Sequence, residues 1–177
     1  MATPSRNPPD LDLARGGWRL DPERTAIEFH TTAFWLIPTK GTFRAIEGAG
    51  AVAADGGVTG TLVVDATSVH TKIRRRDAHL MSADFLDVGT YPTITFEVTG
   101  GRPTGSGAID LDGTLSVQGE SRPLALSANF VARSDSATVW VDVSIDRSAW
   151  GLTSTPFGAG LKTRLFVRAE FDRVGDP

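Results

Sequence analysis

The residues best suited to chemistry lie in one polar segment, Asp65 to Val98, within a chain that otherwise alternates apolar and polar residues. This segment holds two of the three histidines, His70 and His79, and the densest positive run, Arg74 to Arg76. A guanidinium donates hydrogen bonds in a planar fork that suits phosphate, and imidazole can transfer protons near neutral pH. The segment could therefore bind an anionic head group or take part in acid–base chemistry.

Three roles are open to Arg76, Asp77 and His79. Arg76 and Asp77 could form ion pairs and hydrogen bonds that hold a short helix in place. Arg76 or His79 could contact the head group of a ligand, or His79 could act with Asp77 as a catalytic pair. Ser82 and Asp84 are more typical of local hydrogen bonding and capping than of catalysis. The structural role is favoured, the head-group role comes second, and no catalytic residue is predicted.

The sequence lacks the residues that thiol, metal, serine-hydrolase and phosphate-loop chemistry require. The chain has no cysteine, which excludes disulfides and thiol catalysis. His30, His70 and His79 do not form the spaced clusters that first-row metals require, so no metal site is predicted. No Gly-x-Ser-x-Gly elbow and no GxxxxGK loop is present. We expect a protein that is not an enzyme, with His30 as an exposed strand residue.

Length and charge limit the remaining classes. The 177 residues suffice for one domain with a substantial core, and 40% hydrophobic with 22% charged residues is ordinary for a globular protein. The net charge of −3 argues against nucleic acid as a partner. Residues 1–16 are rich in Pro, Asp, Arg and Asn, which predicts a mobile tail before a single domain at 17–174.

The N-terminal sequence has no apolar run typical of a signal peptide, and no segment approaches the ~20 apolar residues of a membrane span. We therefore expect a cytoplasmic protein that does not insert stably into membranes.

Most of the chain alternates with a period of two, which indicates strands with one apolar face. Asp55-Gly56 predicts a hairpin, Gly100 to Pro103 a turn, and Pro38 a break or bend in a strand. Residues 72–81 predict a short helix. About eight strands in meander order would leave two exposed edges unless the sheet closes. The pattern predicts an all-β fold, an antiparallel up-and-down barrel.

The inward residues are almost uniformly aliphatic or aromatic, which fits either a packed core or a cavity for one apolar ligand. Phe34 and Trp35 interrupt the strand rhythm and could lie at a mouth. The candidate lining residues on strands are Phe29, Leu62, Val64, Ile94, Phe96, Val98, Leu115, Leu124, Leu126, Phe130, Val139, Val141 and Val143. Together with Phe34, Trp35, Arg76 and His79 they form the predicted ligand-binding set.

The segment from Arg76 to Asp87, read as Arg-Asp-x-His-Leu-x-Ser-x-Asp-Phe-x-Asp, and the Tyr-Pro-x-Ile-x-Phe that follows to Phe96 resemble the signature of the YceI-like family. Weaker similarities extend from Trp18 to Phe171 and include Arg147-x-x-Trp150-Gly151. Members are lipocalin-like barrels that bind polyisoprenoids and other long-chain lipids.

The resemblance implies a lipid-filled cavity, with an isoprenoid, an isoprenoid quinone or a fatty amphiphile as ligand and no other cofactor. It also implies a homodimer. The competing hypothesis is a packed barrel without ligand that serves as a stress-associated interaction module. One departure is Arg24-Thr25, where relatives often have His-Ser; if that His contacts a ligand in relatives, the contact is changed here.

Overall fold

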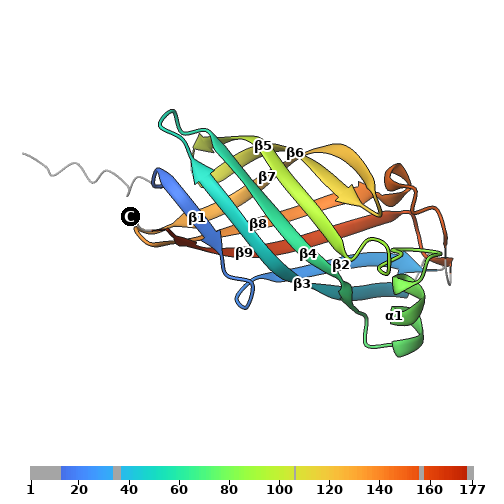
Figure 1. The fold of residues 1–177 in the computed structure, drawn as a ribbon. Helices are drawn as coiled ribbons and strands as arrows, with labels where there is room; N and C mark the ends of the chain where they lie inside the picture. Colours follow the sequence, from blue (N-terminus) through green and yellow to red (C-terminus); the bar gives the residue numbers. More distant parts are fainter. Residues whose placement is uncertain (1–12, 34–36, 106, 156–157, 175–177) are drawn as a thin grey trace, which may run out of the picture.

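Among the described residues, nine antiparallel strands form a barrel, with one α-helix against one end (Figure 1). The computed structural model describes residues 13–33, 37–105, 107–155 and 158–174. The elements are β1 (Gly16–Leu20), β2 (Ala26–Ala33), β3 (Ile37–Val52), β4 (Val58–His70), α1 (Arg74–Met81), β5 (Thr93–Gly105), β6 (Ala108–Val117), β7 (Glu120–Ala132), β8 (Ser136–Asp146), the 3₁₀ helix η1 (Arg147–Trp150) and β9 (Lys162–Arg173).

The barrel closes because β3 pairs with β4 as well as with β1 and β2. Strands β1 and β2 both lie between β3 and β9, each beside a different stretch of these partners. Two short strands thus share one position, and nine strands fill eight positions around the barrel. This confirms the predicted antiparallel barrel, and α1 confirms the predicted helix.

The period of two fixes which side chains face inward. On β8, Val139, Val141 and Val143 alternate with the exposed Trp140 and Asp142. The ladder to β9 is unbroken from Ser136↔Asp172 to Asp146↔Lys162, so the inward series of the two strands stay in register.

Two local predictions of a chain break were wrong. Pro38 does not break a strand: it is the second residue of β3 and lies opposite Thr32, while a bend there stays a prediction. Gly100 to Pro103 is not a turn but the end of β5, where irregular pairing after Val98 and Pro103 absorbs extra residues. Such bulges admit Gly and Pro into a strand that continues past them.

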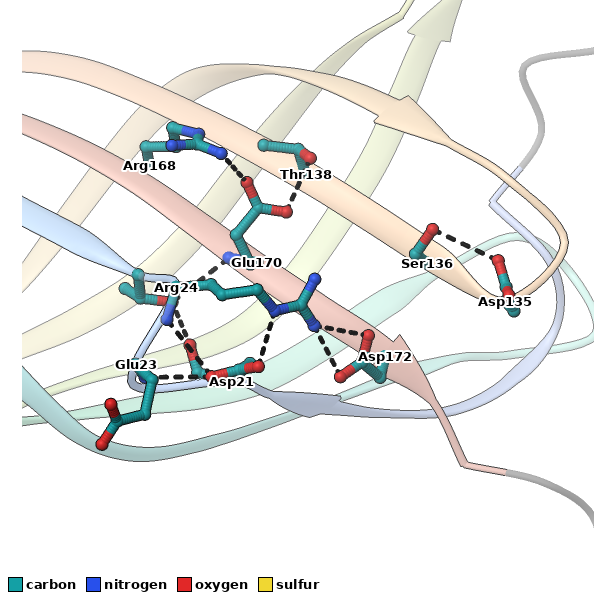
Figure 2. Close-up of polar contacts among 10 residues, drawn as sticks. Asp21, Glu23, Arg24, Asp135, Ser136, Thr138, Arg168, Glu170 and Asp172 are labelled. Atoms are coloured by element: carbon teal, nitrogen blue, oxygen red, sulfur yellow. Dashed lines mark hydrogen bonds and ion pairs between the residues drawn. The ribbon is translucent and has the colours of Figure 1, made fainter.

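The turn between β1 and β2 is fastened to β9 on the outside of the barrel. Figure 2 shows Arg24 between Asp21 and Asp172. Its guanidinium nitrogens lie 2.6 Å from an oxygen of each carboxylate. The hydrogen bond from Arg24 holds the pKa of Asp21 below its ordinary value. Nearby, Glu170 accepts from Arg168 and Thr138. In this chain, therefore, Arg24 ties strands together on the outer surface.

Packing begins before the predicted domain boundary. Leu13 and Ala14, assigned by the sequence to a mobile tail, pack against the core, and the Trp18 indole donates to the Ala14 carbonyl at 3.0 Å. No helix among the described residues is long and apolar enough to cross a membrane.

Candidate functional site: the cavity inside the barrel

The barrel encloses a cavity of about 590 Å³. Its wall runs from Trp18 and Val58 near one end to Ile73 and Thr163 near the end that carries α1. Ligand pockets in proteins typically measure about 300 to 1,000 Å³. The cavity is therefore large enough to hold an organic ligand.

Many inward side chains stay partly accessible although they point away from the outer surface. Phe96, Val98 and Val141 are half-buried, and all three line the cavity. In a fully packed core such side chains would contact one another on every side and lose this accessibility. The barrel is thus hollow. This favours a cavity over a packed core, two interiors that the apolar pattern alone cannot tell apart.

The structure brings the predicted strand residues together on the cavity wall. Those that line it are Phe29, Leu62, Val64, Ile94, Phe96, Val98, Leu115, Leu124, Leu126, Phe130, Val139, Val141 and Val143. Arg76 also lines it, from α1. His79 is half-buried on α1 and is not among the described wall residues. Phe34 and Trp35 lie outside the described residues. Ligand contact by any of these side chains stays a prediction.

Helix α1 is anchored to the barrel through Thr71. The Arg76 guanidinium donates to the hydroxyl and the carbonyl of Thr71 at 2.8 and 2.9 Å, and to the Thr39 hydroxyl at 3.4 Å. Asp77 accepts from the amide and hydroxyl of the same Thr71, and it lies 3.3 Å from His70. Arg76 and Asp77 therefore fix the helix by sharing a partner rather than by pairing with each other.

Asp77 makes this anchor sensitive to acid. Burial acts to raise the pKa of Asp77, but the hydrogen bonds from Thr71, with the nearby His70, outweigh it and leave the pKa below its ordinary value. A carboxylate with a lowered folded-state pKa stabilises the fold fully above its unfolded value of ~3.9. That contribution is lost as the pH falls through the folded value.

We therefore expect Asp77→Asn to lower the free energy of unfolding by about 1 to 2 kcal/mol at pH 7, because a buried charge-assisted contact is weakened. The difference from wild type should shrink as the pH falls below ~4. Urea unfolding of both proteins between neutral and acid pH measures it. A difference that stays constant down to the lowest pH would rule out this role for the Asp77 charge.

The predicted site missed one buried cation of the cavity wall, Arg147. Arg147, at the start of η1, is 5% exposed and lines the cavity. Its guanidinium donates to the carbonyls of Leu152, Ser154, Ala159 and Gly160 and lies 5.1 Å from the centre of the Phe85 ring.

Burial lowers the pKa of Arg147, and the charge of the neighbouring Asp146 opposes that shift. Among the described residues, no carboxylate forms an ion pair with Arg147, so carbonyl dipoles and an aromatic face surround its charge. Arg147 thus fastens the connection between η1 and β9 at the α1 end of the barrel.

The prediction for His30 needs correction. Its side chain points outward, as expected, but it is only 28% exposed. The imidazole packs against the Phe166 ring, with centres 4.6 Å apart, and lies 3.5 Å from Glu28. A neighbouring aromatic on β9 covers it, which the alternation within β2 could not reveal.

Known proteins share this chain's sequence pattern and fold. The family model described as the YceI-like domain matches residues 18–172. A UPF0312 protein of Azotobacter vinelandii is 32% identical over 138 residues, which are 77% of this chain and 64% of that protein. The chain thus spans less than two thirds of the length of this relative.

Two solved structures show the same fold. BcnA of Burkholderia cenocepacia aligns with a TM-score of 0.75 and 16% identity over 85% of this chain and 98% of its own. A polyisoprenoid binding domain from Saccharophagus degradans, implicated in plant cell wall breakdown, aligns with a TM-score of 0.72 and 14% identity over 89% of this chain and 98% of its own. Because the family model spans nearly all of the described barrel, the chain belongs to the YceI-like family.

Proposed function

We propose that this protein binds one long-chain lipid, an isoprenoid or a similar amphiphile, with its tail inside the barrel. The observation that carries the proposal is the 590 Å³ cavity with an aliphatic and aromatic wall. Support also comes from family membership and from the shared fold with a polyisoprenoid binding domain. An isoprenoid quinone or a fatty amphiphile fits the same chemistry.

The cavity has the shape that a long tail needs. Along β9 its wall extends from Thr163 to Phe171, which at about 3.3 Å per residue is roughly 26 Å of strand. Each methylene moved from water into this space contributes ~0.8 kcal/mol. Ten such groups give about 8 kcal/mol, in the range of micromolar binding before the cost of ordering the tail is subtracted.

Charge sets the expected orientation of the ligand. Arg75, Arg76 and Arg147 belong to the wall, and all three come from the segments at the α1 end. A head group that accepts hydrogen bonds, such as a phosphate or a quinone carbonyl, is favoured there because guanidinium groups bind oxygen acceptors. The tail then points toward Trp18 and Val58 at the other end.

Binding without catalysis is part of the proposal. Oδ1 of Asp77 accepts both hydrogen bonds from Thr71, and Oδ2 lies 3.3 Å from His70. His79 is not among the described wall residues. The alternative of a packed, ligand-free interaction module is disfavoured by the half-buried wall side chains. Transport of the lipid, a cytoplasmic location and a homodimer stay predictions from the sequence.

Phe96→Arg should abolish lipid loading and leave the barrel folded. Phe96 lines the cavity from β5, and its ring covers Gly113 of the neighbouring β6, where an added Cβ would come within 2.8 Å of it. A guanidinium in this apolar space repels the tail, because burying an unpaired charge is costly. We expect affinity for an added polyprenyl phosphate or isoprenoid quinone to fall at least a hundredfold.

Quenching of tryptophan fluorescence by the quinone measures the binding, because Trp18 lines the cavity. Circular dichroism reports the fold. Glu97→Arg is the matched control, since Glu97 is exposed on the outer face of the same strand. Equal binding by the wild type and Phe96→Arg would contradict a tail site inside the barrel.

A further inference from the structure

The α1 end of the barrel carries exposed apolar side chains beside exposed cations. Ile37, Ile73 and Leu161 are 57%, 51% and 37% exposed. They come from three segments that reach this end (Figure 1). Ile37 is the first residue of β3, Ile73 directly precedes α1, and Leu161 directly precedes β9.

Backbone and side-chain contacts hold these connections together. The Gly160 amide donates to the Thr32 carbonyl at 2.8 Å, which places Leu161 beside the end of β2. The β2–β3 ladder ends at Ala33↔Ile37. The Arg76 hydrogen bond to Thr39 ties α1 to the same stretch of β3.

Ile37 and Ile73 also line the cavity. The apolar surface of the interior is therefore continuous with the exposed rim. A lipid tail moving between the cavity and an external apolar phase at this rim would stay in contact with apolar side chains.

The same rim is positively charged, in a chain whose net charge is −3. Its exposed cations are Lys40, Lys72, Arg74, Arg75 and Lys162. No carboxylate among the described residues forms an ion pair with Lys72, Arg74 or Arg75.

The carboxylates nearby are mostly engaged. Asp77 accepts from Thr71, and Asp146 accepts from Ser148. Asp84, in the segment after α1, is exposed and reduces the positive charge locally.

We propose that this rim, formed by Ile37, Ile73, Leu161, Lys72, Arg74 and Arg75, docks on the surface of an anionic lipid bilayer. Apolar side chains at the headgroup boundary and cations facing anionic lipids are the two contributions that hold proteins at a membrane surface. The inference rests on the proposed lipid binding, because docking at the mouth gives the ligand a path that avoids water. Docking is peripheral and reversible.

Co-sedimentation with vesicles tests the proposal. The vesicles are phosphatidylcholine alone or with phosphatidylglycerol, and neither contains a polyprenyl lipid. We expect the protein to bind the anionic vesicles at about 0.01 M salt. At about 1 M salt, where the Debye length is ~3 Å, most of the electrostatic contribution to binding should be lost.

The double variant Lys72→Gln, Arg74→Gln should bind the anionic vesicles about 25-fold more weakly, from roughly fivefold per cation near the surface. Neither residue lines the cavity. The matched control is Arg102→Gln, Arg133→Gln, which removes the same charge from exposed positions toward the opposite end. The control should bind as the wild type does.

Equal affinity of the wild type for both kinds of vesicle would overturn the proposal and leave a protein acceptor as the occupant of the rim. Equal losses in the two double variants would also overturn it, since only overall charge would then matter. Leu161→Ser should weaken the attachment that persists at high salt, and an unchanged high-salt fraction would exclude apolar insertion.

Loading of a polyprenyl phosphate from detergent micelles, measured in parallel, keeps the two proposals apart. Loading without vesicle binding would overturn docking alone. Vesicle binding without loading would overturn the lipid site, and with it the reason for docking.

Discussion

Val98→Phe with Val141→Phe should abolish lipid binding and leave the free energy of unfolding unchanged or higher. Both valines line the cavity from different strands, β5 and β8, and both are half-buried because they face open space. Two phenyl rings would occupy much of the volume that a tail needs. They would also bury apolar surface of their own, which is stabilising.

The same double variant separates a hollow barrel from a packed one. In a well-packed core, each enlarged side chain forces its neighbours out of position and typically costs about 1 to 3 kcal/mol. Urea unfolding measures the stability, and quinone quenching of tryptophan fluorescence measures the binding. Ser144→Phe, on the outer face of β8, is the control that adds a ring without filling the cavity. A strongly destabilised double variant would contradict the hollow interior.

Arg147→Leu should lower the free energy of unfolding by about 3 kcal/mol or more. The guanidinium donates to four carbonyls, and those of Leu152 and Ser154 lose the partner described for them when it is removed. The Gly160 carbonyl keeps the Thr31 hydroxyl at 3.4 Å. A buried polar group left without a partner costs about 1 to 3 kcal/mol. Relaxation of the connection between η1 and β9 recovers part of the total, which keeps the expected loss near the low end.

Arg147→Lys separates the charge of this residue from its shape. Lysine keeps the charge, but one ammonium cannot reach carbonyls that a planar guanidinium spans, so we expect only partial rescue. Hydrogen exchange should show faster opening at the amides of Leu152 and Gly160, whose bonds to Arg147 and Thr32 hold this connection. A bound lipid should also leave faster through the loosened end. Wild-type stability in Arg147→Lys would show that a cation suffices there.

The sequence predicted the barrel and part of its wall because one property, the two-residue period, determines both. On β8 the alternation of Val139, Val141 and Val143 with polar neighbours places each side chain without knowledge of the rest of the fold. The prediction failed where a strand is locally irregular. Gly100 to Pro103 has the composition of a turn, but pairing with β6 keeps it in a strand.

Arg147 was missed although a signal existed. It continues the inward parity of Val143 and Ile145, so strict alternation would have placed it on the wall. An arginine at a strand end is usually taken for a surface residue, because its charge is costly to bury. The partners that make burial possible are backbone carbonyls from a separate connection, which no local pattern encodes.

The cavity itself could not be read from the sequence. A packed core and a hollow interior use the same inward residues, and the difference depends on the barrel's radius, which strand number and stagger set. Stagger is a property of pairing such as Ser136↔Asp172, and it emerges only when the strands are in register.

Mass spectrometry of the purified protein tests the central claim most directly, run once under native conditions and once after organic extraction. We predict a complex heavier than the chain by several hundred daltons, with the added mass recovered in the organic phase as a long-chain lipid. An unliganded mass, with no uptake of added polyprenyl or fatty amphiphiles, would contradict lipid binding in the barrel.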